Sequence, residues 1–232
     1  MDLSDPVAAT LLCAEALDRA GIPHAVHGAL LLGAYGEPRE THDADFAIAQ
    51  DDLGAVERAL RHAGLDIRSA FAGLVLGGHT LDRFTLLPGE GDTGLNCVDF
   101  IRPRSPGYRA RALGRALLGP LDGHQIRVLA PEDYLLFKLL STRERDARDA
   151  ASVLRRMGGL LDIALVRREV DALAAEIPDF DIRATLKTLV RLREDPQERR
   201  QADGLPGEVH EMPPARWKRL KAAAQPPKRR RK

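Results

Sequence analysis

Residues 26–48 read VHGALLLGAYGEPRETHDADFAI, and this stretch decides the fold. The overlapping segment Ile22–Val26 is short and extended in character, whereas Gly28–Gly33 has a helical composition without strand alternation. After the loop Gly36–Arg39, the run Asp45–Ile48 is typical of a strand. The stretch therefore predicts a strand, a tight glycine turn, a helix and a second strand.

Outside this stretch, the pattern changes from strands to helices along the chain. Before Pro106, short apolar runs alternate with Gly- and Pro-rich breaks, and after it apolar residues recur mainly at helical spacing. We expect helices from a Ser4 cap to Gly21 and over 51–62, 131–140, 143–157, 162–176 and 181–194, and further strands over 74–76, 83–87, 96–101 and 125–129. This order predicts an α+β (mixed α/β) fold with a helical C-terminal half.

Three regions follow from this division. We expect a catalytic domain over residues 1–125, a helical region over 126–196, and a basic, Pro-containing, disordered tail over 197–232. From Gln197 onward the chain has 11 Lys or Arg against 4 Asp or Glu, although the net charge of the whole chain is only +1. Such a tail either binds RNA or DNA phosphates or is a solvated end without a specific partner.

Composition narrows the class of protein. The chain has 232 residues, of which 44 % are apolar, and no run approaches the roughly 18 apolar residues of a membrane span. It opens Met-Asp-Leu-Ser-Asp without the features of a signal peptide, and Cys13 and Cys97 resemble reduced core thiols. We therefore expect a cytoplasmic globular protein with no membrane association and no disulfide.

Three aspartates carry the chemistry that the sequence suggests. Asp43 and Asp45 are two apart on an extended segment, so their carboxylates point to the same side, and Asp99 interrupts the apolar strand around it. Oxygen-only ligands suit Mg²⁺ or Mn²⁺, and three carboxylates on neighbouring strands are typical of two-metal phosphoryl transfer. Gly28, at a strand-to-helix turn, would let a phosphate approach the positive end of the helix.

With these residues in place, the sequence resembles a known family. Residues 26–45 match its pattern of a glycine turn, a small apolar helix, a Gly-x-x-Arg-x-Thr loop and Asp-x-Asp. Residues 128–139 match its short strand, Pro-Glu-Asp and Lys-bearing helix, followed by Arg143, Asp146 and Asp149. The chain is thus similar, over about residues 20–157, to minimal nucleotidyltransferases of the polymerase-beta-like superfamily, including abortive-infection toxin-type members. The resemblance implies a mixed sheet.

The resemblance also implies roles for individual residues. Asp43, Asp45 and Asp99 would be catalytic and would hold the metal ions, with Asp99 helping to deprotonate the acceptor. The expected nucleotide-binding residues are His27, Gly28, Arg39, Thr41 and Lys138. His27 stands where the family usually has a glycine, so the site could be weakened, altered in specificity or lost. The alternative is that Asp146 and Asp149 have no functional role. They would then form ion pairs with Arg145 or Arg148 on a solvated helix face.

Two functions from different classes are compatible with this sequence. The first is a Mg²⁺-dependent nucleotidyltransferase that moves NMP from an NTP such as ATP to a hydroxyl on tRNA, a protein or a small molecule, as the toxin of a toxin–antitoxin pair or otherwise. The second is a non-catalytic nucleotide- or partner-binding module whose nucleotidyltransferase site has drifted. The sequence does not select the acceptor, the base or the oligomeric state.

Overall fold

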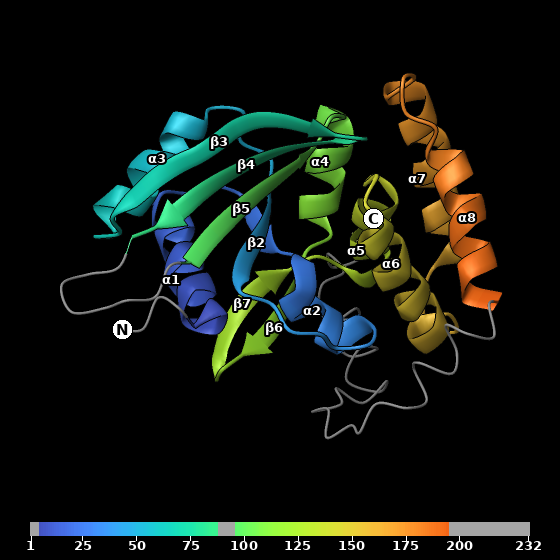
Figure 1. The fold of residues 1–232 in the computed structure, drawn as a ribbon, viewed down its shortest axis with the longest axis horizontal. Coiled ribbons are helices and arrows are strands. Elements are labelled where there is room, and N and C mark those ends of the chain that lie inside the picture. Colours follow the sequence, from blue (N-terminus) through green and yellow to red (C-terminus); the bar gives the residue numbers. More distant parts are fainter. Residues whose placement is uncertain (1–4, 88–95, 195–232) are drawn as a thin grey trace, which may run out of the picture.

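The computed structural model describes residues 5–87 and 96–194, and within them it shows a mixed α/β fold (Figure 1). The strands are β1 (His24–Val26), β2 (Asp43–Ile48), β3 (Ile67–Leu76), β4 (His79–Leu86), β5 (Asn96–Pro103), β6 (Leu117–Leu121) and β7 (His124–Val128). The helices are α1 (Pro6–Arg19), α2 (Gly28–Tyr35), α3 (Leu53–His62), α4 (Pro106–Gly114), α5 (Pro131–Leu139), α6 (Glu144–Met157), α7 (Ile163–Glu176) and α8 (Ile182–Glu194). The predicted basic tail lies outside the described residues.

One mixed sheet organises the molecule, with the strand order β3-β4-β5-β2-β1-β7-β6. β2 runs parallel to β5 and antiparallel to β1, and β4 runs antiparallel to β5. This register pairs Asp45 with Asp99 across β2 and β5, and Asp99 with Arg83 across β5 and β4. Residues far apart in the chain therefore meet at one level of the sheet.

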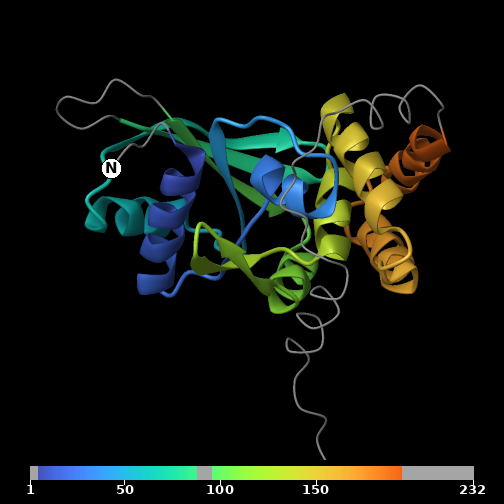
Figure 2. The same cartoon turned by 90° about the horizontal axis from the view of Figure 1, so that it is seen from below.

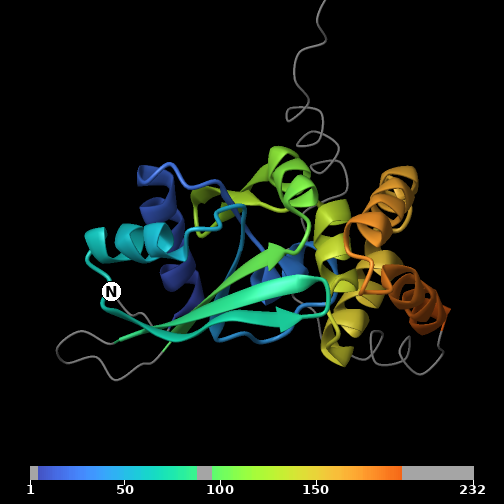
Figure 3. The ribbon, with the colours of Figure 1, turned by 90° about the horizontal axis from the view of Figure 1, so that it is seen from above.

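Helices cover the sheet, and a further group of helices lies beside it. α1, α3 and α4 pack on one face, as Figure 2 shows, while α2 lies across β2 on the other side. α5, α6, α7 and α8 form a helical group beside the sheet, on the right of Figure 3. The aromatic side chains Phe46, Phe84 and Phe100 are fully buried between these layers and form the centre of the core. None of the helices within 5–87 and 96–194 combines the length and apolar character needed to cross a membrane.

Most predicted elements are present, with corrections at their ends. The cap of α1 is Asp5, whose carboxylate accepts a hydrogen bond from the backbone N–H of Val7 at 2.9 Å; Ser4 is outside the described residues. The helix α3 begins at Leu53 rather than at residue 51, and Asp52 takes the cap position without a side-chain hydrogen bond. Asp51 lies before the helix, and its carboxylate pairs with Arg109 of α4.

Three elements differ more strongly from the sequence-based prediction. β3 has ten residues, whereas the sequence predicted three. The rest of the strand was missed because β3 is an edge strand, exposed along most of its length, and its sequence lacks apolar alternation. β6 was not predicted because Gly119 and Pro120 suggest a turn; at the sheet edge a proline costs no ladder hydrogen bond. The helix α4 was also missed, although Ser105 caps it and Pro106 opens it. The predicted boundary at residue 125 falls inside β7.

Candidate active site

One cavity of about 200 Å³ brings all eight predicted site residues together. They come from the end of β1, the start of α2, the loop before β2, β2 itself, β5 and α5. The residues are His27, Gly28, Arg39, Thr41, Asp43, Asp45, Asp99 and Lys138. Sheet pairing supplies the close approach: β2 and β5 lie side by side, and the register sets Asp45 opposite Asp99.

The carboxylates on the two strands differ in exposure and in pKa. The Asp99 side chain is only 4 % exposed, whereas that of Asp43 is 37 % exposed. Burial, followed by the negative charge of Asp99, raises the pKa of Asp45 to about 7. Burial also raises the pKa of Asp99, against the opposing effect of Arg83. Ionising Asp45 and Asp99 is therefore unfavourable unless a further positive charge lies nearby.

Arg83 of β4 is a residue of this site that the sequence analysis did not select. Its Nε donates to Asp99 Oδ1 at 2.6 Å, and its Nη2 donates to Asp99 Oδ2 at 2.8 Å and to Asp43 Oδ2 at 2.9 Å. These bonds, that to Asp99 first, raise the pKa of Arg83. The sequence did contain a signal for this residue: Arg83 lies in a predicted strand beside the apolar residues Phe84 and Leu86. An arginine that faces inward from such a strand must reach a negative charge.

The carboxylates fit a divalent cation by their chemistry. Their ligand atoms are all oxygens, which suits Mg²⁺ or Mn²⁺, and the Asp45 side chain forms no hydrogen bond or ion pair with any other described residue. Within residues 5–87 and 96–194, however, no group of three His, Cys, Asp or Glu side chains is arranged to hold a metal ion. The guanidinium of Arg83 bridges two of the three carboxylates, Asp43 and Asp99.

Gly28 is required by its neighbour as well as by its backbone. Its φ is +71°, and a Cβ added there would overlap with the carboxylate of Asp45. The backbone N–H of His27 donates to the Asp45 carbonyl at 2.9 Å, which holds the turn against β2. The glycine at position 28 therefore allows the start of α2 to contact the Asp45 carboxylate. This is a second reason for a glycine here, beside the access for a phosphate that the sequence predicts.

The His27 side chain turns toward α5. Its ring lies 5.0 Å from the Tyr134 ring and 5.1 Å from the Phe137 ring, centroid to centroid, and the residue is only 4 % exposed. Burial, aided by the charge of Lys138, lowers the pKa of His27 well below its usual value, so the ring is neutral at pH 7. Although His27 contributes to the cavity wall, most of its ring is withdrawn from the cavity.

Lys138 belongs to a buried charge network. Its Nζ donates to Asp146 at 2.6 Å and to Asp149 at 2.9 Å, and its side chain is 3 % exposed. Arg39 adds two 3.3 Å hydrogen bonds to Asp149. Burial alone would raise the pKa of Asp146, but Lys138 and Arg143 together hold that pKa below its usual range. The alternative of a solvated face is wrong, because Asp146 and Asp149 point inward to these partners.

The loop before β2 is held against α6. Arg155 pairs with Glu37 at 2.8 Å, and the Ser152 hydroxyl accepts from the backbone N–H of Glu37 at 3.2 Å. Together with the contact of Arg39 to Asp149, this fixes the loop at the cavity. Thr41 adds a long 3.4 Å hydrogen bond from its hydroxyl to the Asp43 carbonyl.

Further cations line the same cavity. Arg143 is half-exposed and paired with Asp146 at 2.7 Å, whereas Arg145 is exposed and has no ion pair with any residue in 5–87 or 96–194. The cavity lining therefore combines the three sheet carboxylates with cations from the loop, from α5 and from the start of α6. Such a lining can bind a polyphosphate through its cations and a metal ion through its carboxylates.

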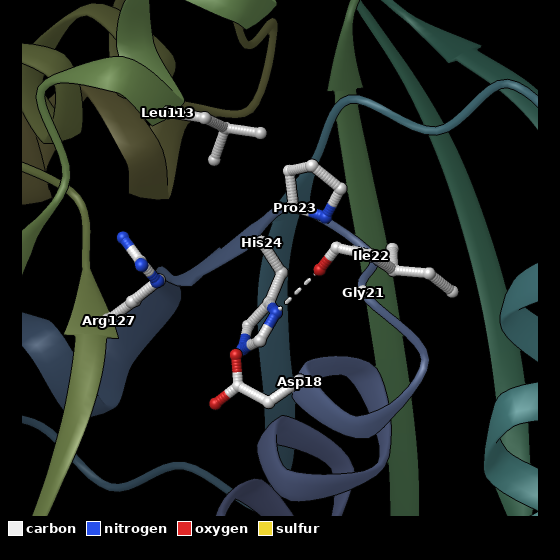
Figure 4. A pocket seen from close by; sticks show the side chains of 7 residues that line it. All are labelled: Asp18, Gly21, Ile22, Pro23, His24, Leu113 and Arg127. Carbon is white, nitrogen blue, oxygen red and sulfur yellow. Dashed lines mark hydrogen bonds between the residues drawn. The ribbon is translucent and has the colours of Figure 1, made fainter.

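A second cavity, of about 320 Å³, lies elsewhere, where the end of α1 approaches β1 and β7 (Figure 4). Its titratable residues are Asp18, His24 and Arg127, and His24 Nδ1 lies 3.0 Å from the Ile22 carbonyl oxygen. Burial lowers the pKa of His24. None of the predicted site residues lines this cavity, so we place the candidate active site at the carboxylates.

Comparison with known proteins adds similarities of fold only. No family model and no curated protein match this sequence. Among solved structures, a nucleotidyltransferase-like protein from Paracoccidioides brasiliensis is 20 % identical, with 79 % of this chain and 93 % of that chain covered and a TM-score of 0.46. The antibiotic-resistance factor ANT(2″)-Ia is 15 % identical, with 75 % and 95 % covered and a TM-score of 0.47.

A third solved structure, the lincosamide adenylyltransferase LnuA bound to lincomycin, is 13 % identical, with 66 % of this chain and 98 % of that chain covered and a TM-score of 0.38. The solved structures that this chain resembles are thus nucleotidyltransferases and nucleotidyltransferase-like proteins. Because these TM-scores are below 0.5, we base the function on the residues of the site.

Proposed function

We propose that this protein transfers a nucleoside monophosphate from a nucleoside triphosphate, such as ATP, to a hydroxyl group. One observation carries the proposal: Asp43, Asp45 and Asp99 converge with the start of α2 at one cavity that Arg39, Lys138, Arg143 and Arg145 also line. Carboxylates alone would repel a triphosphate, and cations alone would not activate a hydroxyl. Carboxylates and cations in one cavity suit a reaction in which both are needed.

In this proposal, the acceptor oxygen attacks the α-phosphorus and the bond to the leaving pyrophosphate oxygen breaks. Asp99 takes the proton of the hydroxyl, since each of its oxygens keeps a lone pair beyond the bond to Arg83. Arg39, Arg143 and Arg145 bind the β- and γ-phosphates, with the remaining N–H of Lys138. Gly28 and Thr41 position the phosphates through the backbone at the start of α2 and through the loop, with His27 setting the turn.

Asp43, Asp45 and Asp99 would hold Mg²⁺ or Mn²⁺. When bound, the cation neutralises phosphate charge and lowers the pKa of the hydroxyl that attacks. The remaining work is done by the chain itself, which orients the two substrates and accepts the proton.

The experiment is incubation with each α-³²P-labelled NTP and Mg²⁺, in the presence of total tRNA, cell lysate or hydroxyl-bearing small molecules. Wild-type protein is compared with Asp43→Ala/Asp45→Ala and with Asp66→Ala/Asp171→Ala, which removes two exposed acids outside the cavity. Label transferred by wild type and by the control, but not by the site variant, supports the function and identifies the acceptor. Equal labelling by all three proteins contradicts it.

The toxin-type role needs its own test, since it comes from the sequence resemblance alone. Induced expression should stop bacterial growth, and Asp43→Ala/Asp45→Ala should restore it. Growth that is unaffected by the wild-type protein argues against this role but leaves the chemistry open to the labelling experiment.

A second function, the non-catalytic binding module, is favoured by one observation: Arg83 already pairs with two of the three acids. Isothermal titration separates the two functions. Mg²⁺-dependent NTP binding that is lost in Asp43→Ala/Asp45→Ala supports the enzyme, whereas NTP binding that needs no Mg²⁺ and survives this change supports the module.

A further inference from the structure

Arg83 gives the carboxylate site an internal cation, and this inference rests on the proposed function. We propose that Arg83 competes with the divalent cation for Asp43 and Asp99, so that the metal enters only as the guanidinium releases Asp43. Arg83 would then set the metal affinity of the site. The sequence resemblance assigns it no role.

The geometry makes Arg83 a specific partner of the site. Arg83 and Asp99 face each other directly across β4 and β5, and two parallel hydrogen bonds, at 2.6 and 2.8 Å, join the guanidinium to the carboxylate. Such a bidentate pair is stronger and more directional than a single contact. The third bond, at 2.9 Å to Asp43, uses the same Nη2 atom. One side chain therefore links the acids of β2 and β5.

The three contacts are unequal, and this decides where the link opens. Asp99 is buried and uses both oxygens, whereas Asp43 is more exposed and offers one oxygen. Exposed ion pairs are weak because water screens them. The bond from Arg83 to Asp43 should therefore break first. The ring of Phe71, whose centroid is 5.9 Å from the guanidinium carbon, can support the guanidinium after it leaves Asp43.

Charge explains why the competition matters. When ionised, the three carboxylates carry three negative charges. The positive charge of Arg83 offsets one of them, so a bound cation interacts with a smaller net negative charge. A divalent cation and a guanidinium also repel each other at the 3–4 Å separations of a shared carboxylate. The pairing of Arg83 should therefore weaken metal binding and favour a single bound ion over two.

The test is a Mn²⁺ titration of the full chain, after treatment with a chelator and without nucleotide, followed by electron paramagnetic resonance. Arg83→Gln should bind Mn²⁺ at least about tenfold more tightly than wild type, the equivalent of about 1.4 kcal/mol. Arg83→Lys keeps the charge but cannot fork both oxygens of Asp99, so its affinity should lie between the two. Arg145→Gln is the matched control, since it removes the same charge from the same cavity without breaking an ion pair.

Equal Mn²⁺ affinity in wild type and Arg83→Gln would overturn the inference, and so would an equal gain in Arg145→Gln, which would indicate a general charge effect. If Arg83→Gln does not fold, an increase of Mn²⁺ affinity in Arg83→Lys supports the inference and its absence overturns it. Failure of the proposed function is distinguishable: labelling then fails while the Mn²⁺ titration still separates the variants. No Mn²⁺ binding by any variant overturns the inference and leaves the proposed function to the labelling experiment.

Discussion

Two acidic clusters meet at one cavity, which Asp146 of the first and all three acids of the second line, and they differ in how their charge is compensated. Asp146 and Asp149 of α6 are paired with Lys138, Arg39 and Arg143. Among the sheet acids, Asp43 and Asp99 share Arg83, and the Asp45 side chain forms no ion pair within residues 5–87 and 96–194. A cluster with matched partners stabilises structure, whereas a cluster with excess charge is suited to bind a cation. From this comparison we propose a structural role for the α6 acids and a chemical role for the sheet acids.

The largest expected effect is on activity, from the sheet cluster. Asp43→Ala/Asp45→Ala should lower NMP transfer by about 10⁴-fold, the equivalent of roughly 5.5 kcal/mol, because the cation and the substrates lose their ligands. Its Tm should remain within a few degrees of wild type, because Arg83 keeps both hydrogen bonds to Asp99 when Asp43 is removed and the Asp45 side chain forms no ion pair with any described residue. A large fall in Tm with modest loss of activity would reverse the comparison.

Removing the cation of the other cluster should act mainly on stability. Lys138→Met leaves Asp146 and Asp149 buried next to fewer positive charges, and should lower the free energy of unfolding by about 3–5 kcal/mol. Chemical denaturation measures this, with Lys187→Met on the exposed face of α8 as the control. If Lys138→Met and Lys187→Met are equally stable, the α6 cluster is not structural.

Gly28 tests the contact between α2 and the sheet acids. Gly28→Ala should cost about 1–3 kcal/mol of stability, because φ is positive there and the new Cβ overlaps with the Asp45 carboxylate. In an Asp45→Gly background, the overlap is removed and only the backbone cost remains. The loss of stability caused by Gly28→Ala should therefore be smaller in that background than in the wild-type protein. Strict additivity of the two changes, measured by denaturation, would contradict the contact.

The smallest effect concerns pH. Because the pKa of Asp45 is raised to about 7 in the folded protein, the folded state holds a proton that the unfolded state releases near pH 4. Stability from this group is therefore present at low pH and is lost as pH rises toward 7. With a chelator present, the Tm of wild type should fall by a few degrees relative to Asp45→Asn between pH 4.5 and 7.5. Parallel Tm profiles would show that Asp45 is not perturbed.

Local signals predicted much of this molecule. The turn at Gly28, the strand at Asp45 and the helices after Pro131 were predicted because glycine, alternation and helical periodicity act over a few residues. The edge strands β3 and β6 were underpredicted or missed because their formation depends on neighbours that are distant in sequence. The roles assigned to the eight site residues stay predictions, although the structure places all of them around one cavity.

The sequence by itself determined which residue types are available: three acids in extended segments, a glycine before a small helix, and a lysine within an apolar helix. Only the tertiary structure decided how their charges are matched. It paired Lys138 with Asp146 and Asp149, and it set Arg83 against Asp99 and Asp43 through the register of β4, β5 and β2. Charge pairing depends on distances of a few ångströms between residues from different elements, and sequence spacing does not contain these distances.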